Sequence, residues 1–193
     1  RFLYGESPYD IPENFFRTSF NDAKWDKIKV PSNWEMLGYG EPVFRNVTSP
    51  FPTRLPRAMA DSLRRIVNGE IPASDASKRM AQYRLSSMSS DPFAVEVPEV
   101  PMEFNPSGAY RKAVNIPSSW KGDKIFIRFE KVASAFFLWV NGQEVGYNEG
   151  AQEPAEFDIT GYVKPGRNTI AVLVTKYSDG YYLEGQDYWR LAG

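Results

Sequence analysis

The residues best suited to chemistry lie near the C-terminal end of the chain, between residues 178 and 190. This stretch contains the carboxylates Asp179, Glu184 and Asp187 together with tyrosines, a tryptophan and an arginine. Carboxylates accept hydrogen bonds from sugar hydroxyls, and aromatic rings give ligand sites their apolar faces. A polar, aromatic loop after an apolar strand predicts either a binding surface or a pad that packs against a neighbouring domain. The composition of the loop leaves both alternatives open.

Two residue types that carry much of enzyme chemistry are missing from the sequence. It has no histidine, which excludes Ser-His-Asp triads and imidazole acid–base catalysis within this chain, and no cysteine, which excludes disulfides and thiolate chemistry. The net charge of −1 gives no electrostatic reason to expect nucleic acid as a partner. No apolar run approaches the roughly 20 residues that span a bilayer, so no membrane span is expected.

Strand patterns dominate the sequence from Ala109 onward, with proline and glycine turns between them. Runs of strand-like length lie at residues 110–116, 125–129, 135–140 and 169–175. Asn141 and Gly142 supply the two positive-φ positions of a type I′ hairpin turn. Residues 25–30 also alternate apolar and polar side chains, which predicts a half-buried strand. Short strands at this spacing predict an all-β fold, either a β-sandwich or a jelly roll.

Residues 52–92 differ in composition from the rest of the chain, and they predict a helical insertion within the β-fold. A first helix is expected to end at Gly69, with an apolar side formed by Met59, Leu63, Ile66 and Val67. A second helix is expected to begin after Ser74, a favourable N-cap, and to end near Leu85. Its apolar side would be formed by Ala76, Met80 and Tyr83.

The sequence resembles the N-terminal sugar-binding domain of glycoside hydrolase family 2. The resemblance is carried by residues 108–111, 133–142, 145–147 and 154–160. Pro-Ser-Asn-Trp-Glu at residues 31–35, Asn-Val-Thr at residues 46–48 and the stretch 178–190 are similar to the β-galactosidase branch of that family. Nearly the whole chain outside the insertion is covered. The resemblance implies a jelly-roll β-sandwich of the galactose-binding-domain type, followed in the family by an immunoglobulin-like domain and a catalytic (β/α)8 barrel.

The family's catalytic glutamates, one acid/base and one nucleophile, lie in the barrel, which this sequence does not include. The resemblance therefore implies that residues 1–193 form a single sugar-binding domain, truncated at both ends, with no catalytic residue of its own. The parent protein would be a retaining β-galactosidase that hydrolyses terminal β-galactosides. This chain would contribute substrate-contacting loops to the barrel and would be inactive alone.

The resemblance assigns Asn46 and Asp179 to the substrate site, as ligands of galactosyl hydroxyls. It also implies Asp179 as a sodium ligand in the full-length enzyme, where magnesium is a second expected ion; no cofactor is expected in this fragment. From the residues alone, Asn46 could instead be a turn asparagine and Asp179 could form an Asx-type turn before Gly180.

Further expectations concern residues around this site and in the core. Glu184 and Asp187 are expected to bond to the barrel domain rather than to the sugar, and Trp139 and Phe137 are expected in the sandwich core. Tyr181 occupies a position where the family commonly has a small residue. Its bulk beside Asp179 implies a changed shape of the galactose pocket.

Two other functions stay open at the level of the sequence: a stand-alone carbohydrate-binding module, and a family 2 glycosidase of other sugar specificity, such as a glucuronidase. The expected partners are a galactoside, the downstream domains and, in a homo-oligomer, further copies of the chain. The insertion is expected near the mouth of the site, where it would restrict access, contact a neighbouring subunit or be a neutral decoration. The compartment, cytoplasmic or periplasmic in a bacterial-type protein, stays open.

Overall fold

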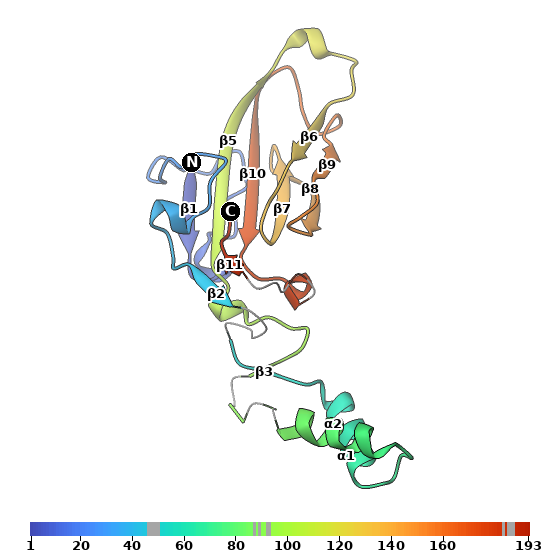
Figure 1. The fold of residues 1–193 in the computed structure, drawn as a ribbon. Coiled ribbons are helices and arrows are strands. Elements are labelled where there is room, and N and C mark those ends of the chain that lie inside the picture. The colour runs from blue at the N-terminus through green and yellow to red at the C-terminus, as the bar shows by residue number, and fades with distance from the viewer. Residues whose placement is uncertain (46–50, 87, 89, 92–93, 183, 185–187) are drawn as a thin grey trace.

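The structure is a computed structural model that describes residues 1–45, 51–86, 88, 90–91, 94–182, 184 and 188–193. Its main element is a five-stranded antiparallel sheet with the strand order β1–β5–β10–β7–β8 (Figure 1). These strands are β1 (Phe2–Gly5), β5 (Ser107–Ile116), β10 (Gly166–Thr175), β7 (Ala135–Val140) and β8 (Gln143–Glu149). The regular elements of the described residues are mostly strands in antiparallel sheets, with two α-helices, so the predicted all-β class is confirmed.

Three strand pairs complete the sheets. β6 (Phe126–Phe129) pairs antiparallel with β9 (Ala155–Asp158), and β2 (Val43–Arg45) pairs antiparallel with β11 (Tyr188–Arg190). β3 (Thr53–Arg54) and β4 (Val95–Glu96) form a short parallel pair. Short 3₁₀ turns η1–η5 lie at Pro8–Asp10, Glu35–Leu37, Met102–Phe104, Ser118–Trp120 and Asp179–Tyr182.

The two long strands β5 and β10 pair along their whole length and form the centre of the large sheet. At the other edge, β7 turns into β8 through Asn141 and Gly142, whose φ angles are +52° and +83°. Both values are positive, as a type I′ turn requires, so the predicted hairpin is confirmed.

One face of the large sheet packs against β6 and β9. Phe136 of β7 is 1% exposed, and its ring lies 4.6 Å from that of Phe129 and 5.9 Å from that of Phe157. At the β1 end of the same core, the fully buried Trp34 packs near Phe2, with ring centroids 6.1 Å apart. Large rings that interdigitate in this way bury much apolar area, which supplies the main stabilising free energy of the fold.

The opposite face of the large sheet is covered by the irregular segment between β1 and β2. Phe15 and Trp25 from this segment pack on the sheet with Trp139, whose ring lies 5.3 Å from that of Phe15. Phe137 stacks beside Trp139 at 5.9 Å between centroids. Trp139 is half-buried and packs against this cluster, as expected for a core residue. Phe137 is also half-buried but contacts Trp139 and the exposed Tyr147 instead, so its expected place in the core stays a prediction.

The strand predicted at residues 25–30 is wrong. Only Asp26 pairs with a strand, through an isolated bridge to Phe2, and the residues that follow run on without a strand partner among the described residues. The alternating pattern has another cause. Trp25 is 8% exposed because it packs on the second face of the sheet, and Tyr39 donates a hydrogen bond to the Asp26 carboxylate at 2.8 Å.

The insertion contains two helices, α1 (Arg57–Val67) and α2 (Asp75–Ser86), which lie beyond one end of the large sheet (Figure 1). Gly69 follows α1 with a φ of +79°, and the Ser74 hydroxyl accepts a hydrogen bond from the Ser77 N–H at 3.2 Å. The predicted helix end and N-cap are therefore confirmed. Neither helix is long and apolar enough to cross a membrane, and this holds for every helix in the described part of the chain.

The predicted apolar side of α2 is wrong as a packing surface. Met80 and Tyr83 are 56% and 69% exposed, whereas Ala81 is 2% exposed and Ala60 of α1 equally so. Alanine has no side chain beyond Cβ, so buried alanines allow two helices to approach closely. In α2 the buried position is therefore Ala81 rather than the larger Met80 and Tyr83, while Leu63 and Ile66 of α1 are half-buried.

Candidate sugar-binding site

The stretch that begins with Ser178 continues directly from β10, the central strand of the large sheet. After β10 the chain stays buried through Lys176, Tyr177 and Ser178, and then forms the turn η5 (Asp179–Tyr182). The Tyr181 N–H donates to the Ser178 carbonyl at 3.1 Å and closes the turn. The turn is therefore attached to a rigid strand end, the usual place for binding loops.

Asp179 is exposed, although its neighbour Ser178 is 7% exposed and Tyr181 is 4% exposed. Its Oδ1 accepts a hydrogen bond from the N–H of the adjacent Gly180 at 3.1 Å, a local bond within the turn rather than an Asx turn, which would bond two residues on. A carboxylate has two oxygens and about four lone-pair positions, so this one bond leaves acceptor capacity for a ligand. The turn role and the ligand role are thus compatible in one side chain.

The end of β8 lies beside this turn and adds a second carboxylate. A methyl group placed on Gly180 would lie 3.6 Å from the Glu149 carboxyl carbon, so the turn and Glu149 are close neighbours. The Tyr147 hydroxyl donates to Glu149 Oε2 at 2.8 Å. Partial burial raises the pKa of Tyr147, and the carboxylates of Glu149 and Asp179 raise it further, so the hydroxyl remains a donor at neutral pH. The surface around Asp179 is therefore rich in acceptors, which suits hydroxyl groups.

Glu184 makes a bond within the domain. Its Oε1 accepts the N–H of Ala151 at 2.8 Å and so fixes the loop between β8 and β9 to the segment after η5. The expected contact of Glu184 with another domain stays a prediction. Asp187, for which the same contact was expected, lies outside the described residues.

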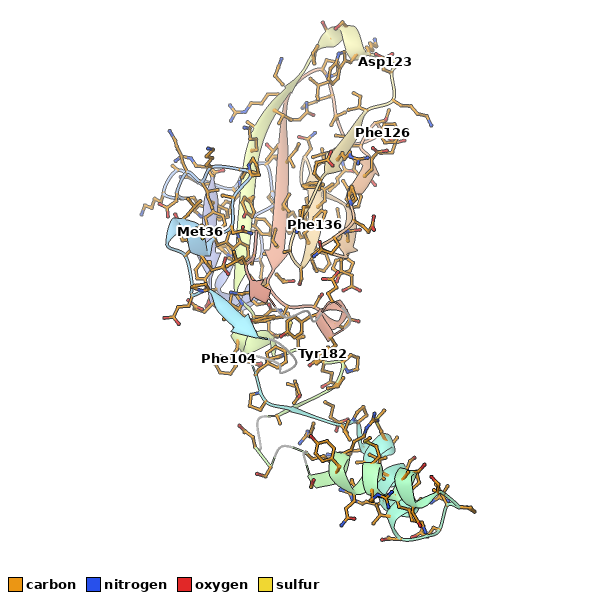
Figure 2. The ribbon with its side chains drawn as sticks, viewed as in Figure 1. Met36, Phe104, Asp123, Phe126, Phe136 and Tyr182 are labelled. Carbon is orange, nitrogen blue, oxygen red and sulfur yellow. The ribbon has the colours of Figure 1, made fainter. Side chains whose placement is uncertain are left out.

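An aromatic cluster anchors the turn to the base of the insertion. The ring of Phe51, just before β3, lies 5.4 Å from Tyr177, 6.0 Å from Tyr181 and 6.4 Å from Tyr182. The Tyr182 hydroxyl also donates to the Glu99 carbonyl, and burial raises its pKa to about 12, with Tyr181 and Glu99 contributing. Tyr182 projects toward the insertion side of the sheet (Figure 2). The bulk of Tyr181 is thus accommodated in this cluster, inside the domain.

The two segments predicted to contact the substrate, one leading to Asn46 and one containing Asp179, are joined by paired strands. β2 (Val43–Arg45) pairs with β11 (Tyr188–Arg190), so the segment that leads to residue 46 runs beside the segment that follows the Asp179 turn. Asn46 itself lies outside the described residues, and its contact with sugar stays a prediction.

A cavity of about 290 Å³ lies beneath the turn. Polar groups from several segments line it, among them Asn33, Ser134, Lys176, Tyr181 and Glu184. Its volume is at the lower end of the range for small-ligand sites. Asp179 is not among the residues that line it, so the carboxylate presents its acceptors to the outer surface instead.

The predicted role of Asp179 as a sodium ligand stays a prediction. Among the described residues, no three Asp or Glu side chains converge as they would around a metal ion, and the sequence has no histidine or cysteine. Hard cations take about six oxygen ligands. The exposed Asp179 carboxylate could supply one such oxygen, with backbone carbonyls, amide oxygens or water as the others.

The family assignment follows from comparison with known proteins. The model described as "Glycosyl hydrolases family 2, sugar binding domain" matches residues 1–86 and 75–193. The chain therefore belongs to this family.

Several individual proteins are similar to this chain. A β-galactosidase of Priestia megaterium is 36% identical over 192 residues, which cover 100% of this chain and 15% of the relative. A β-galactosidase of Yersinia pestis bv. Antiqua is 35% identical over 193 residues, 14% of its length. Among solved structures, a β-glucuronidase from an uncultured Clostridium species matches 35% of this chain and 12% of its own, with 28% identity and a TM-score of 0.35. The chain thus spans about one seventh of the curated relatives it matches.

Tyr147 and Glu149 lie beside the candidate site, and the sequence did not predict this. Both lie on β8, in a segment that the resemblance covers only in part, and nothing in their spacing indicates proximity to Asp179. Only their alternation along β8, which puts residues 147 and 149 on the same face of the sheet, could have indicated that they act together.

Proposed function

We propose that the full-length protein is a retaining β-galactosidase in which this domain supplies Asp179 to the sugar site. The observation that carries the proposal is an exposed carboxylate on a turn that buried neighbours hold in place. Support comes from curated relatives named β-galactosidases, which match the chain over its whole length. A carboxylate fixed in this way accepts hydrogen bonds from sugar hydroxyls with little reorganisation on binding.

Asn46 is the proposed second contact. A side-chain amide both donates and accepts, so it can pair with a hydroxyl whichever way that hydroxyl is oriented. Asp179 and Asn46 together would pair with particular hydroxyls of galactose. An epimer with one hydroxyl displaced would leave a polar group of the site unpaired, and such a loss discriminates strongly between sugars.

Bond cleavage is proposed to take place in a (β/α)8 barrel that follows an immunoglobulin-like domain in the full-length protein. A retaining glycosidase uses one carboxyl as acid/base and another as nucleophile, about 5–5.5 Å apart. The resemblance assigns both to the barrel, so within the full-length protein this domain is expected to help bind and orient the sugar without hydrolysing it. Asp179 would also give a sodium ion one oxygen ligand. No residue of this chain is assigned to magnesium.

The test is the kinetics of an Asp179→Asn variant of the full-length enzyme with a nitrophenyl β-galactoside. The variant replaces one acceptor oxygen with a donor, so kcat/KM should fall by about 100-fold or more. The matched control is Asp123→Asn, an exposed aspartate at the far end of the sheet from the turn (Figure 2), which should leave kcat/KM unchanged.

Three results would contradict the proposal. A nearly normal kcat/KM for Asp179→Asn would remove Asp179 from the site. A wild-type enzyme that hydrolyses β-glucuronides and not β-galactosides would change the sugar. A full-length chain without a barrel, together with tight galactose binding by residues 1–193, would favour a stand-alone binding module.

A further inference from the structure

A buried ion pair lies at the point where the chain leaves β10 and continues toward the Asp179 turn. Lys176, the first residue after β10, and Glu35 of η2 bring Nζ and Oε1 to 2.6 Å, and the side chains are 5% and 2% exposed. Withdrawing two charges from water is costly unless they are paired and hydrogen bonded. This pair meets that condition, because each partner makes a further bond.

These further bonds reach both strands of the β2/β11 pair. Lys176 Nζ also donates to the Glu41 carbonyl at 3.1 Å, just before β2 begins. Glu35 Oε2 accepts the Ala192 N–H at 3.1 Å, just after β11 ends, and the Trp34 N–H donates to the Ala192 carbonyl at 2.9 Å. One ion pair therefore contacts the entry to β2, the exit from β11 and the start of the Asp179 turn.

The strand register shows that these hydrogen bonds lie at one end of the β2/β11 strand pair. Val43 of β2 lies opposite Arg190 of β11, and these are the residues closest along the chain to Glu41 and Ala192. The ion pair thus bonds to residues that lie two positions outside the two strands, at the same end of the β2/β11 pair. Residue 46 follows the other end of β2.

Stability alone is a poor explanation for a buried ion pair. Well-packed apolar side chains of similar volume are often as stabilising as a buried ion pair, or more so. Apolar side chains could not, however, accept the Ala192 N–H or donate to the Glu41 carbonyl. What the ions add is a fixed geometry between segments that are distant in the sequence.

We propose that Glu35 and Lys176 are positioning residues that hold the β2/β11 pair and the Asp179 turn at one fixed separation. The inference rests on the proposed function, because that separation matters when both segments contact one sugar. Small displacements of contacting groups cost much activity, since a misplacement of about 1 Å can lower rates about 100-fold. The pair touches no substrate itself and acts through the backbone atoms that it bonds.

The test compares stability and kinetics in the full-length enzyme. Lys176→Met leaves Glu35 buried and unpaired, so its Tm should fall. Glu35→Met/Lys176→Met replaces the ions with an apolar pair, so Tm should recover. KM for a nitrophenyl β-galactoside should nevertheless stay raised by about tenfold in the double variant, with kcat much less changed, because contacts made in both ground and transition states are weakened. A double variant in which KM recovers together with Tm would overturn the inference.

A milder variant tests the same idea if the double variant fails to fold. Glu35→Gln keeps the volume, but its one amide oxygen can accept from Lys176 Nζ or from the Ala192 N–H, not from both. KM should rise severalfold, and an unchanged KM would overturn the inference. The matched control is Glu130→Gln, which removes a carboxylate from the exposed Arg128–Glu130 pair and should leave KM unchanged.

Failure of the inference is distinguishable from failure of the proposed function. A wild-type enzyme that hydrolyses β-galactosides while all ion-pair variants keep a normal KM overturns only the inference. If the wild-type enzyme hydrolyses β-glucuronides instead, the proposed sugar is wrong, and the KM for glucuronides then decides the role of Glu35 and Lys176 by the same criterion.

Discussion

The β-sheet part of the domain, called the sandwich below, and the helical insertion of residues 52–92 differ in which side chains they bury. In the sandwich, Trp34 is fully buried and Phe136 is 1% exposed, and large rings pack on both faces of the sheet. Among the described residues of the insertion, the buried side chains are Ala60 and Ala81, while Tyr83 is 69% exposed. Apolar burial stabilises by about 25 cal/mol per Å², so the insertion has far less stabilising contact than the sandwich. Stability within one chain is therefore expected to be uneven.

The contacts that stabilise the insertion lie at its base rather than along its helices. Phe51 contacts the tyrosine cluster, and β3 pairs with β4. Glu96 of β4 lies 3.8 Å from the Arg54 guanidinium and 3.6 Å from that of Arg57. The Phe51 contacts thus connect the base of the insertion to the turn of the proposed sugar site. Its tip is expected to be the part of the chain that opens most easily.

The largest expected effect is on the sandwich core, in Phe136→Ala. Loss of this ring, which packs against Phe129 and Phe157, should lower the free energy of unfolding by about 3–5 kcal/mol. Urea unfolding of the 193-residue chain measures it. The control is Phe126→Ala, a ring of the same kind that is 50% exposed (Figure 2), for which the loss should be about 1 kcal/mol or less. Equal losses would show that the burial difference does not decide stability here.

A smaller effect is expected in the insertion from Ser74→Ala. The Ser74 hydroxyl accepts the Ser77 N–H, so its loss should destabilise α2 by about 1 kcal/mol. Hydrogen exchange should show faster exchange of the α2 amides and unchanged exchange of the β5 and β10 amides. Ser62→Ala, in the interior of α1, is the control and should not speed exchange in α2. Equal acceleration in the sheet would contradict the independence of the two regions.

The smallest stability effect is expected when a short Gly-Ser linker replaces residues 55–94. The Tm of the sandwich should change by only a few degrees, because the insertion contributes little to either core. If the insertion restricts access or contacts a neighbouring subunit, the full-length variant should change its assembly state or its preference between short and long galactosides. Unchanged assembly together with unchanged preference would identify the insertion as a neutral decoration.

The predictable parts of the fold are those fixed by local sequence. The Asn141-Gly142 turn and the apolar alternation of β10 are local patterns, and the structure contains both elements. Residues 25–30 show the same alternation but are not a strand, because pairing depends on a neighbour that local sequence does not specify. For the same reason the α2 helix was predictable while its packing side was not.

In the candidate site, too, local sequence indicates some residues, whereas others come together only through the fold. Asp179 could be predicted because it belongs to a short contiguous motif that resembles a known family. The bond between Lys176 and Glu35 joins residues 141 positions apart, and no local pattern indicates it. Tyr147 and Glu149 approach the turn only because β8 ends beside it. Asn46 lies outside the described residues and stays a prediction from resemblance.

The parallel pairing of β3 with β4 has a consequence for how this chain can evolve. Thr53 lies opposite Val95, so the two ends of the helical segment are held side by side by this strand pair. The entropy cost of closing a loop between fixed ends grows only slowly with its length, by about 0.6 kcal/mol for each doubling. Relatives could therefore lengthen, shorten or exchange this segment at little thermodynamic cost. Because the segment begins beside the proposed sugar site, such changes could alter which sugars the site accepts.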